Sequence, residues 1–429
     1  ERSFRVDREK QKSSTASRGM VSTAFPEATL AGVEMLERGG NAVDAACASA
    51  LALCVCEPQA CGIGGQTMAV LCLGSRYFYI NGSGPVPSGL DPGLLSPHDL
   101  EYGYRATTVP TTIAVLDHMN RLYGRLKWAE IFEPAIAVAR EGYEITQLQQ
   151  SLQKKNLEIF QKVSPGTGKD YFLKQGRPYE SGDRFRQRDL GATLEHLAQN
   201  GAQDFYIGDI ARAIARDMED HQGFLSLKDL KGFKGPEETH VLERSLNGLT
   251  FHVPPPPAPG RGLLMMLEIR DRISRLARSG REREEIIAAE IIRTVLTSLA
   301  VSPVSPAAYG LATDPLLEPG YLNEAAKNIL AHHPCTGTTR LPQPKGGETT
   351  HLSVMDKDGN AVGITQSVNL VYGSKAAAKG LGFLYNNYLV DCNRADPGHP
   401  HYLKPSGLSV SMVCPTIVSH RSRPWMVTG

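Results

Sequence analysis

Residues 349–368 have the sequence TTHLSVMDKDGNAVGITQSV. The polar run DKDGN in the middle is typical of a tight turn, and the alternating residues on either side predict the two strands of a β-hairpin. Centring this hairpin on Asp358 places the hydroxyls of Thr349 and Ser367 opposite each other at its open end, and a slip of a residue or two would still bring them together. The other predicted pairs are Met355 with Ala361, Ser353 with Gly363, and His351 with Thr365.

A Thr at the start of a strand, directly behind the Gly-Gly-Glu sequence of residues 346–348, is the arrangement of an N-terminal nucleophile. The Thr349 hydroxyl would attack the carbonyl of Glu348, and hydrolysis of the resulting ester would free the Thr349 amine. Such an amine has an ordinary pKa of about 7.7–8.0, so it can act as general base to its own hydroxyl without a His. Two Thr residues at a strand start also suit plain β-propensity, so the pattern by itself leaves both interpretations open.

Composition excludes several classes of protein. The chain has 429 residues with 46 Lys and Arg against 45 Asp and Glu, whereas proteins that bind nucleic acids carry a basic excess. Hydrophobic residues make up 41% and charged residues 21%, as in ordinary globular proteins. No run approaches the roughly 20 apolar residues that span a bilayer. We therefore expect an enzyme-sized protein with a small-molecule partner, and neither a nucleic-acid nor a membrane partner.

The eight cysteines predict no metal site. Cys54, Cys56 and Cys61 lack the paired Cys-x-x-Cys spacing of a zinc site, and most of the cysteines lie in apolar runs, so we expect buried, reduced thiols and no cofactor. Reduced thiols favour a cytoplasmic location. The sequence beginning at Glu1 shows no apolar signal segment, although a leader removed before this residue is the alternative.

Hydrophobic periodicity and turn residues predict the elements on either side of this hairpin. Asn41 is placed to cap an Ala-rich helix, and residues 334–347, rich in Pro and Gly, predict an extended loop. The expected helices are 26–38, 42–54, 132–140 and 263–273, and the expected hairpin strands are 67–73 and 77–80.

Residues 346–362 (GGETTHLSVMDKDGNAV) resemble the processing-site segment of the gamma-glutamyltransferase family of N-terminal nucleophile hydrolases. The resemblance extends over nearly the whole chain and implies an α+β fold, a four-layer αββα sandwich. The other similar motifs are residues 19–23, 39–46, 57–65, 254–256 and 415–418.

The resemblance also implies roles for individual residues. Thr349 would be the nucleophile, with the processing site between Glu348 and Thr349. Ser367 takes the place of the family's Thr that hydrogen-bonds the nucleophile, and Asn369 aligns with a substrate-contacting Asn. Asp391 matches the Asp that holds the substrate's α-amino group; without the resemblance it would be interpreted as an ordinary strand-end carboxylate.

Processing would divide the chain into two subunits of one precursor. Residues 1–348 would form the large subunit and residues 349–429 the small subunit, both contributing to a single αββα domain. The family's sequences continue past the position of Gly429 into a Gly-Gly turn that supplies oxyanion donors. The resemblance therefore predicts that the small-subunit segment is C-terminally incomplete.

Three departures from the family fall on the substrate pocket. Residues 83–87 read SGPVP, where the family has an Arg-Glu-x-Ala-Pro segment whose Arg pairs with the substrate's α-carboxylate. A Ser side chain cannot form the two hydrogen bonds that an Arg guanidinium makes with a carboxylate. Ser411-Met412 stands in place of the family's Ser-Ser, and Tyr388 in place of a Gln. We expect all three positions to contact substrate, and the substrate to be larger or more apolar than a γ-glutamyl peptide such as glutathione.

These observations leave three hypotheses, in order of preference. The first is an autoprocessed Thr enzyme that hydrolyses or transfers an acyl group from an amide. Arg105 or Arg76 could replace the missing carboxylate ligand, although nothing in the sequence points to either of them. The second is cleavage of a C–C bond in an amino-acid-derived metabolite, as in relatives from pyrroline-type antibiotic pathways. The third is an inactive family member with a binding role. Cephalosporin acylases and a capsule-processing transpeptidase are other relatives with altered pockets.

Overall fold

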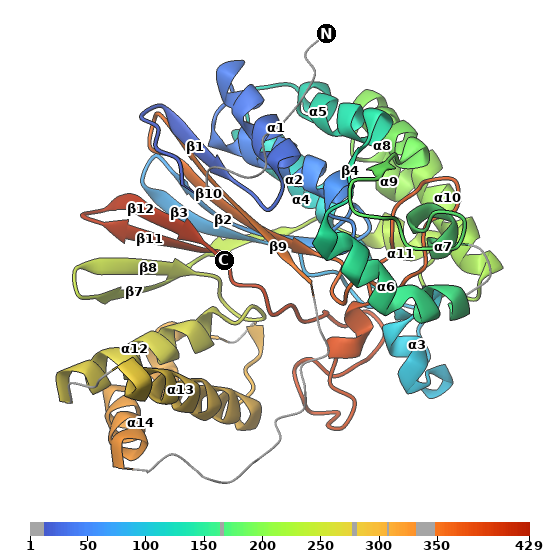
Figure 1. Cartoon of the computed structure of the whole chain (residues 1–429). Helices are drawn as coiled ribbons and strands as arrows, with labels where there is room; N and C mark the ends of the chain where they lie inside the picture. The colour runs from blue at the N-terminus through green and yellow to red at the C-terminus, as the bar shows by residue number, and fades with distance from the viewer. Residues whose placement is uncertain (1–12, 164–166, 277–280, 307–308, 332–347) are drawn as a thin grey trace.

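Two antiparallel β-sheets lie face to face between two layers of helices (Figure 1). The computed structural model describes residues 13–163, 167–276, 281–306, 309–331 and 348–429. The larger sheet consists, in spatial order, of β1 (Gly19–Ser22), β9 (Thr350–Asp356), β10 (Ala361–Ser367), β2 (Gln66–Leu73), β3 (Arg76–Asn81) and β6 (Glu237–His240). The smaller sheet consists of β12 (Arg423–Thr428), β11 (Thr416–His420), β8 (Leu249–Val253) and β7 (Leu242–Leu246).

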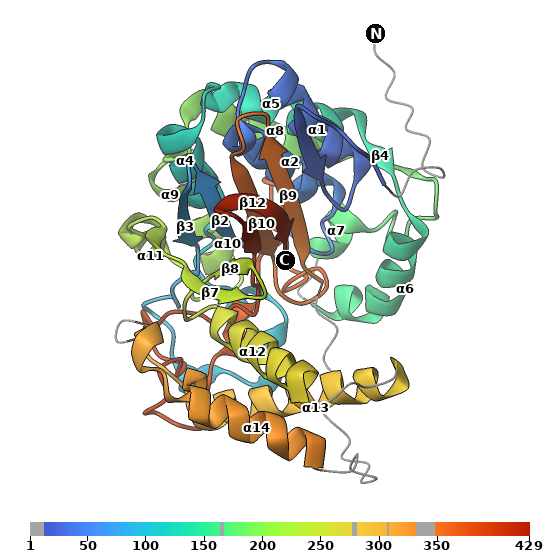
Figure 2. The same ribbon diagram turned by 90° about the vertical axis from the view of Figure 1, so that its left-hand side faces the viewer.

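The helices fall into two groups, on the outer faces of the two sheets (Figures 1 and 2). Those on the side of the larger sheet include α1 (Pro26–Glu37), α2 (Ala42–Cys56), α4 (Thr112–Tyr123), α5 (Trp128–Glu141), α6 (Gln147–Lys162), α8 (Arg188–Asn200) and α10 (Asp209–Asp220), with the short α3 (Pro97–Glu101), α7 (Gly168–Phe172), α9 (Asp204–Ile207) and α11 (Leu227–Gly232). Those beside the smaller sheet are α12 (Gly260–Leu276), α13 (Arg281–Val301) and α14 (Pro319–Ala331).

Strand β2 shows how the layers are held together. Successive side chains of a strand point to opposite faces. Ala69 and Leu71 accordingly join the core formed with the helices around α2, whereas Met68 and Val70 join a second core with Ile417 of β11. A third core lies between the smaller sheet and α12–α14. The αββα sandwich is therefore confirmed. Within the described residues, no helix has both the length and the apolar character needed to cross a membrane.

The predicted elements are largely confirmed. Helices 26–38 and 42–54 correspond to α1 and α2, and the predicted segments 132–140 and 263–273 lie within α5 and α12. Strands β2 and β3 form the expected hairpin. The predicted loop 334–347 lies outside the described residues, as does Cys335. The other seven cysteines are free, and six of them are buried as expected.

The hairpin of β9 and β10 has the register that was predicted. Met355 pairs with Ala361, Ser353 with Gly363, and His351 with Thr365. One detail differs, because β9 begins at Thr350 and Thr349 lies just before the strand. The hairpin sits inside the larger sheet, with β1 on one side and β2 on the other, so strands from before and after residue 348 share one hydrogen-bonded sheet.

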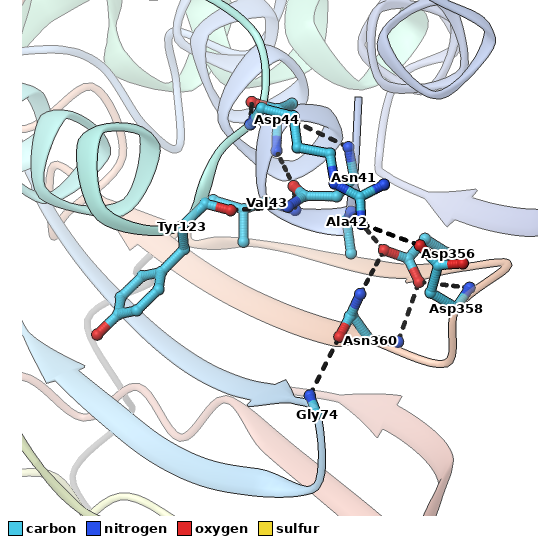
Figure 3. Close-up of polar contacts among 10 residues, drawn as sticks. Asn41, Ala42, Val43, Asp44, Gly74, Tyr123, Asp356, Asp358 and Asn360 are labelled. Carbon is cyan, nitrogen blue, oxygen red and sulfur yellow. Dashed lines mark hydrogen bonds and ion pairs between the residues drawn. The ribbon is translucent and has the colours of Figure 1, made fainter. Parts of the chain in front are cut away.

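Asp356 ties the turn of this hairpin to the first turn of α2 (Figure 3). Its Oδ2 accepts hydrogen bonds from the Ala42 backbone N–H at 3.0 Å and from Asn360 Nδ2 at 2.8 Å, while Oδ1 accepts from the backbone N–H groups of Asp358 and Asn360. Asn41 caps the same helix end through its side chain. A carboxylate at a helix N-terminus also interacts favourably with the helix dipole, so α2 and the hairpin are locked together.

We expect Asp356→Ala to lower the free energy of unfolding by about 2–3 kcal/mol. The variant loses four hydrogen bonds to a carboxylate, one of which comes from the first turn of α2. Asp358→Ala is the matched control. It removes an exposed ion pair with Arg125 and should cost no more than about 1 kcal/mol. Urea unfolding of both variants measures the difference, and equal losses would contradict the role given to Asp356.

Candidate active site

The open end of the hairpin brings two hydroxyl groups together. Thr349 Oγ1 donates a hydrogen bond to Ser367 Oγ at 3.1 Å, the contact that the register predicted. Ser367 is buried at the end of β10, whereas Thr349 is exposed. The nucleophile candidate is therefore open to an incoming molecule, and its partner is held inside the protein.

Ser367 also contacts the peptide bond that precedes Thr349. Its hydroxyl donates to the carbonyl oxygen of Glu348 at 3.0 Å and accepts from the backbone N–H of Asn369 at 2.8 Å. With the hydrogen bond from Thr349, the Ser367 oxygen has one donated and two accepted hydrogen bonds, which exhausts its capacity. Its orientation is therefore fixed, and an unbroken chain of hydroxyls leads from Thr349 to the Glu348 carbonyl.

A glycine permits this close packing behind Ser367. A Cβ atom on Gly65 would lie 2.3 Å from the Ser367 carbonyl oxygen, a separation that side chains do not adopt. Only glycine brings the backbone this near to another backbone. The Gly-rich sequence after α2 is thus part of the support of the site.

Asn369 and Asp391 lie together beside the two hydroxyls. Asn369 Nδ2 donates to Asp391 Oδ2 at 2.9 Å, and also to the Asn387 carbonyl at 3.3 Å. Asp391 as a residue is exposed, yet burial of its carboxyl group raises its pKa to about 6, while the hydrogen bond from Asn369 lowers it. This carboxyl group is ionised at neutral pH.

The three remaining candidates differ in their surroundings. Tyr388 is buried, and burial raises the pKa of its phenol, while the nearby hydroxyls of Ser411 and Ser367 lower it. Ser411 is also buried, and its Oγ has no hydrogen-bond partner within the described residues. Met412 is two-thirds exposed. The structure therefore brings Tyr388 and Ser411 close to the hydroxyl pair and leaves Met412 at the surface.

Both arginines considered as carboxylate ligands have other partners in the structure. Arg105 donates to the backbone carbonyls of Gln222 and Leu94 and to the Gln222 side chain, and Arg76 forms an ion pair with Glu238. None of these contacts involves the hydroxyl pair or Asp391. Among the described residues, Asp391 forms no ion pair, and no Lys or Arg shifts its pKa.

One group of side chains has the spacing of a metal site. His196, Asp204 and Asp209 bring their ligand atoms within 4.8 Å of one another. Asp204, however, already accepts hydrogen bonds from the backbone N–H groups of Asp209 and Ile210, and it pairs with His196. These contacts account for the cluster as the cap of α10.

The family model described as gamma-glutamyltranspeptidase matches residues 28–429. The chain belongs to this family.

Among curated members, the chain is 28% identical to the glutathione hydrolase proenzyme of Escherichia coli (strain K12) over 438 residues, covering 96% of this chain and 75% of that protein. It is also 28% identical to the acylase ACY 1 proenzyme of Pseudomonas sp. (strain V22) over 430 residues, covering 96% and 76%. The crystal structure of a cephalosporin acylase from Bacillus halodurans superimposes with a TM-score of 0.82 at 25% identity, covering 99% of this chain and 80% of that one.

The sequence analysis of this gamma-glutamyltranspeptidase family member did not identify Glu57 as a candidate site residue. Glu57 follows the last residue of α2 and is only 8% exposed. Burial raises the pKa of its carboxyl group to about 7. A charged Glu directly before Pro58, at the end of an apolar helix, could have drawn attention to this position. The sequence does not show which groups its carboxyl group faces.

His351 is the nearest histidine along the chain, and its contacts exclude it as a base for Thr349. Nδ1 is hydrogen-bonded to Thr365 Oγ1 at 2.8 Å and Nε2 to Ser353 Oγ at 3.0 Å. Burial lowers the pKa of its imidazole to about 4. The ring is neutral at physiological pH and holds two hydroxyls of the hairpin.

This histidine makes stability depend on pH. A folded pKa of about 4 against an unfolded value of about 6.5 means that the unfolded chain binds the extra proton between these values. The contribution of neutral His351 to the free energy of unfolding is complete above about pH 6.5 and is lost as the pH falls towards about 4. We expect the melting temperature to fall over this window, and to fall less in His351→Gln. Calorimetry checks this; identical pH profiles would contradict it.

Proposed function

We propose that Thr349 is the nucleophile of an enzyme that cuts its own chain between Glu348 and Thr349 and then hydrolyses or transfers the acyl group of an amide substrate. The observation that supports this is the hydrogen-bonded chain from Thr349 Oγ1 through Ser367 Oγ to the Glu348 carbonyl, with lengths of 3.1 and 3.0 Å. This chain of hydrogen bonds connects the attacking Thr349 hydroxyl, through the proton carrier Ser367, to the peptide bond that would be cut.

The same chain provides a route for the proton in the first step. As Thr349 Oγ1 bonds to the Glu348 carbonyl carbon, its proton passes to Ser367, and the Ser367 proton passes to the carbonyl oxygen. The tetrahedral intermediate is therefore neutral. When the C–N bond breaks, the proton on that oxygen moves to the nitrogen, leaving an ester and a free amine. Water then hydrolyses the ester and restores the Thr349 hydroxyl.

The freed amine prepares Thr349 for its substrate. In its neutral form the amine removes the hydroxyl proton while the oxygen attacks the amide carbon of the substrate, and the leaving amine takes up that proton. The acyl ester then passes to water or to an acceptor amine. Residues 1–348 and those from 349 onward would remain together, because β1, β9, β10 and β2 share one sheet.

Self-cleavage gives the direct test. Wild-type protein should appear on a denaturing gel as two fragments, with Thr349 as the N-terminal residue of the smaller one. Thr349→Ala should remain one chain. Ser367→Ala should cleave about 10²-fold more slowly or worse, because a proton carrier and a carbonyl donor are lost together.

Ser353→Ala is the matched control for this series. The Ser353 hydroxyl lies on the same hairpin but contacts His351 and the Val427 carbonyl instead of the cut bond. It should therefore cleave like the wild type. A wild-type protein that stays as one chain, or a Thr349→Ala variant that cleaves, would contradict the proposed function.

The substrate is proposed to carry an amine or another hydrogen-bond donor, and no carboxylate equivalent to that of glutathione. Asp391, held by Asn369, supplies a negative charge beside the nucleophile. Ser83 stands where the family has its carboxylate-binding Arg, and Arg76 and Arg105 are held elsewhere. The similarity to acylase proenzymes supports this choice of a larger or more apolar acyl group.

The titration of Asp391 gives this proposal a pH signature. An amine-bearing amide should bind to the ionised carboxylate, so KM should rise as the pH falls below about 6, the pKa of this group. Asp391→Asn should raise KM about tenfold and remove this dependence, whereas an amide without the amine should be unaffected. Steady-state kinetics between pH 5 and about 8 decides; if glutathione is the best substrate tested, the substrate proposal is wrong.

A further inference from the structure

Glu57 has a buried carboxyl group that forms no ion pair with any described residue. The residue is 92% buried at the end of α2, and its Oε2 has no hydrogen-bond partner within the described residues. Uncompensated carboxylates are costly to bury. The proposed self-cleavage supplies the missing partner.

The neighbours of Glu57 place it across from the backbone of Thr349. Alternate side chains of a strand share a face, and on β9 the side chains of Leu352 and Val354 join the core on the side of α2. Thr350 lies on this same face and is buried. Glu57 lies near the two side chains that flank Thr349, because the Thr350 hydroxyl lowers its pKa and the Glu348 carboxylate raises it.

The two faces of the chain at this point therefore differ. The side chain of Thr349 meets Ser367, while the flanking residues meet Glu57 on the opposite side. Oγ1 of Thr350, like Oε2 of Glu57, has no hydrogen-bond partner in the described part of the chain. The carboxyl group is thus close to the cut bond and retains hydrogen-bonding capacity.

The charges around Glu57 are of one sign. Glu348 raises the pKa of Glu57, and the Thr350 hydroxyl lowers it. The thiols of Cys56 and Cys61 also face it, and burial raises their pKa values so far that both are neutral. Among the described residues, no Lys, Arg or His shifts the pKa of Glu57.

We propose that Glu57 is the counter-ion of the α-ammonium group that self-cleavage creates on Thr349. Cleavage turns an amide nitrogen, which carries no charge, into an amine that binds a proton near neutral pH. The ammonium group then pairs with the Glu57 carboxylate on the face of β9 that packs against α2. The same cut leaves a second carboxylate on Glu348, which Glu57 repels.

Glu57 thereby separates the two new chain ends. It retains the N-terminus that catalysis uses and drives the C-terminus away from the nucleophile. Since an opposite charge favours the ionised form, the amine pKa should lie above its ordinary range of about 7.7–8.0. Glu57 is a positioning residue in this account, because it acts on the base and does not contact the substrate.

The test compares the titration of the N-terminal amine in wild type and Glu57→Gln, both as the cleaved full chain. The rate at which an acylating reagent modifies the Thr349 amine, followed by mass spectrometry, reports its neutral fraction at each pH. With an amide that carries no amine, whose binding does not depend on Asp391, the acidic limb of kcat/KM reports the same group. Both midpoints should move about one pH unit towards acid in Glu57→Gln. Asp217→Asn, which removes another buried carboxylate, should leave them unchanged.

Coincident midpoints in wild type and Glu57→Gln would overturn the inference while leaving the proposed function in place. If Glu57→Gln does not fold or cleave, the wild-type titration decides alone: a midpoint above about 8.0 supports the pair, and one at or below that value overturns it. A wild-type chain that never cleaves would overturn both this inference and the proposed function on which it rests.

Discussion

The hydrogen bond between Thr349 and Ser367 is the contact on which the site depends. It exists because the hairpin of β9 and β10 has one particular register. A shift by one residue would turn the side chains of one strand to the other face of the sheet. Asp356 holds that register by joining the turn to α2, and Gly65 allows the backbone of Ser367 to lie against the loop that follows the same helix.

Alternation along β9 also gives the peptide bond between Glu348 and Thr349, where we propose the cut, two different environments. On the face of the smaller sheet, hydroxyls form a continuous path for a proton, whereas a buried carboxyl group lies on the face of α2. The first environment suits the formation of a neutral tetrahedral intermediate. The second suits the charged amine that exists only after cleavage. One short segment thus supports two successive chemical states of the same nitrogen.

The sequence predicted the hairpin well because its information is local. The DKDGN turn and the alternating flanks specify both the strands and their register, and this register led to Ser367 without any relative. The four layers came from the resemblance to a family, since the periodicity of separate segments does not say which sheet each joins. The start of β9 was misplaced by one residue because strand boundaries depend on tertiary hydrogen bonds.

Contacts between residues far apart in the sequence were the hardest to predict. Arg105 and Arg76 were considered as ligands, yet their partners Gln222 and Glu238 are remote in sequence and became visible only in the folded chain. Glu57 was overlooked for the same reason, because its significance comes from Thr350 and Glu348.

Covalent trapping of the nucleophile tests the central claim most directly. The protein is treated with a β-lactone, digested, and mapped by mass spectrometry. The account predicts one adduct, on the side-chain oxygen of Thr349, in a peptide that begins at this residue. An unmodified Thr349, or an adduct at another residue in a chain that is intact across residues 348 and 349, would contradict it.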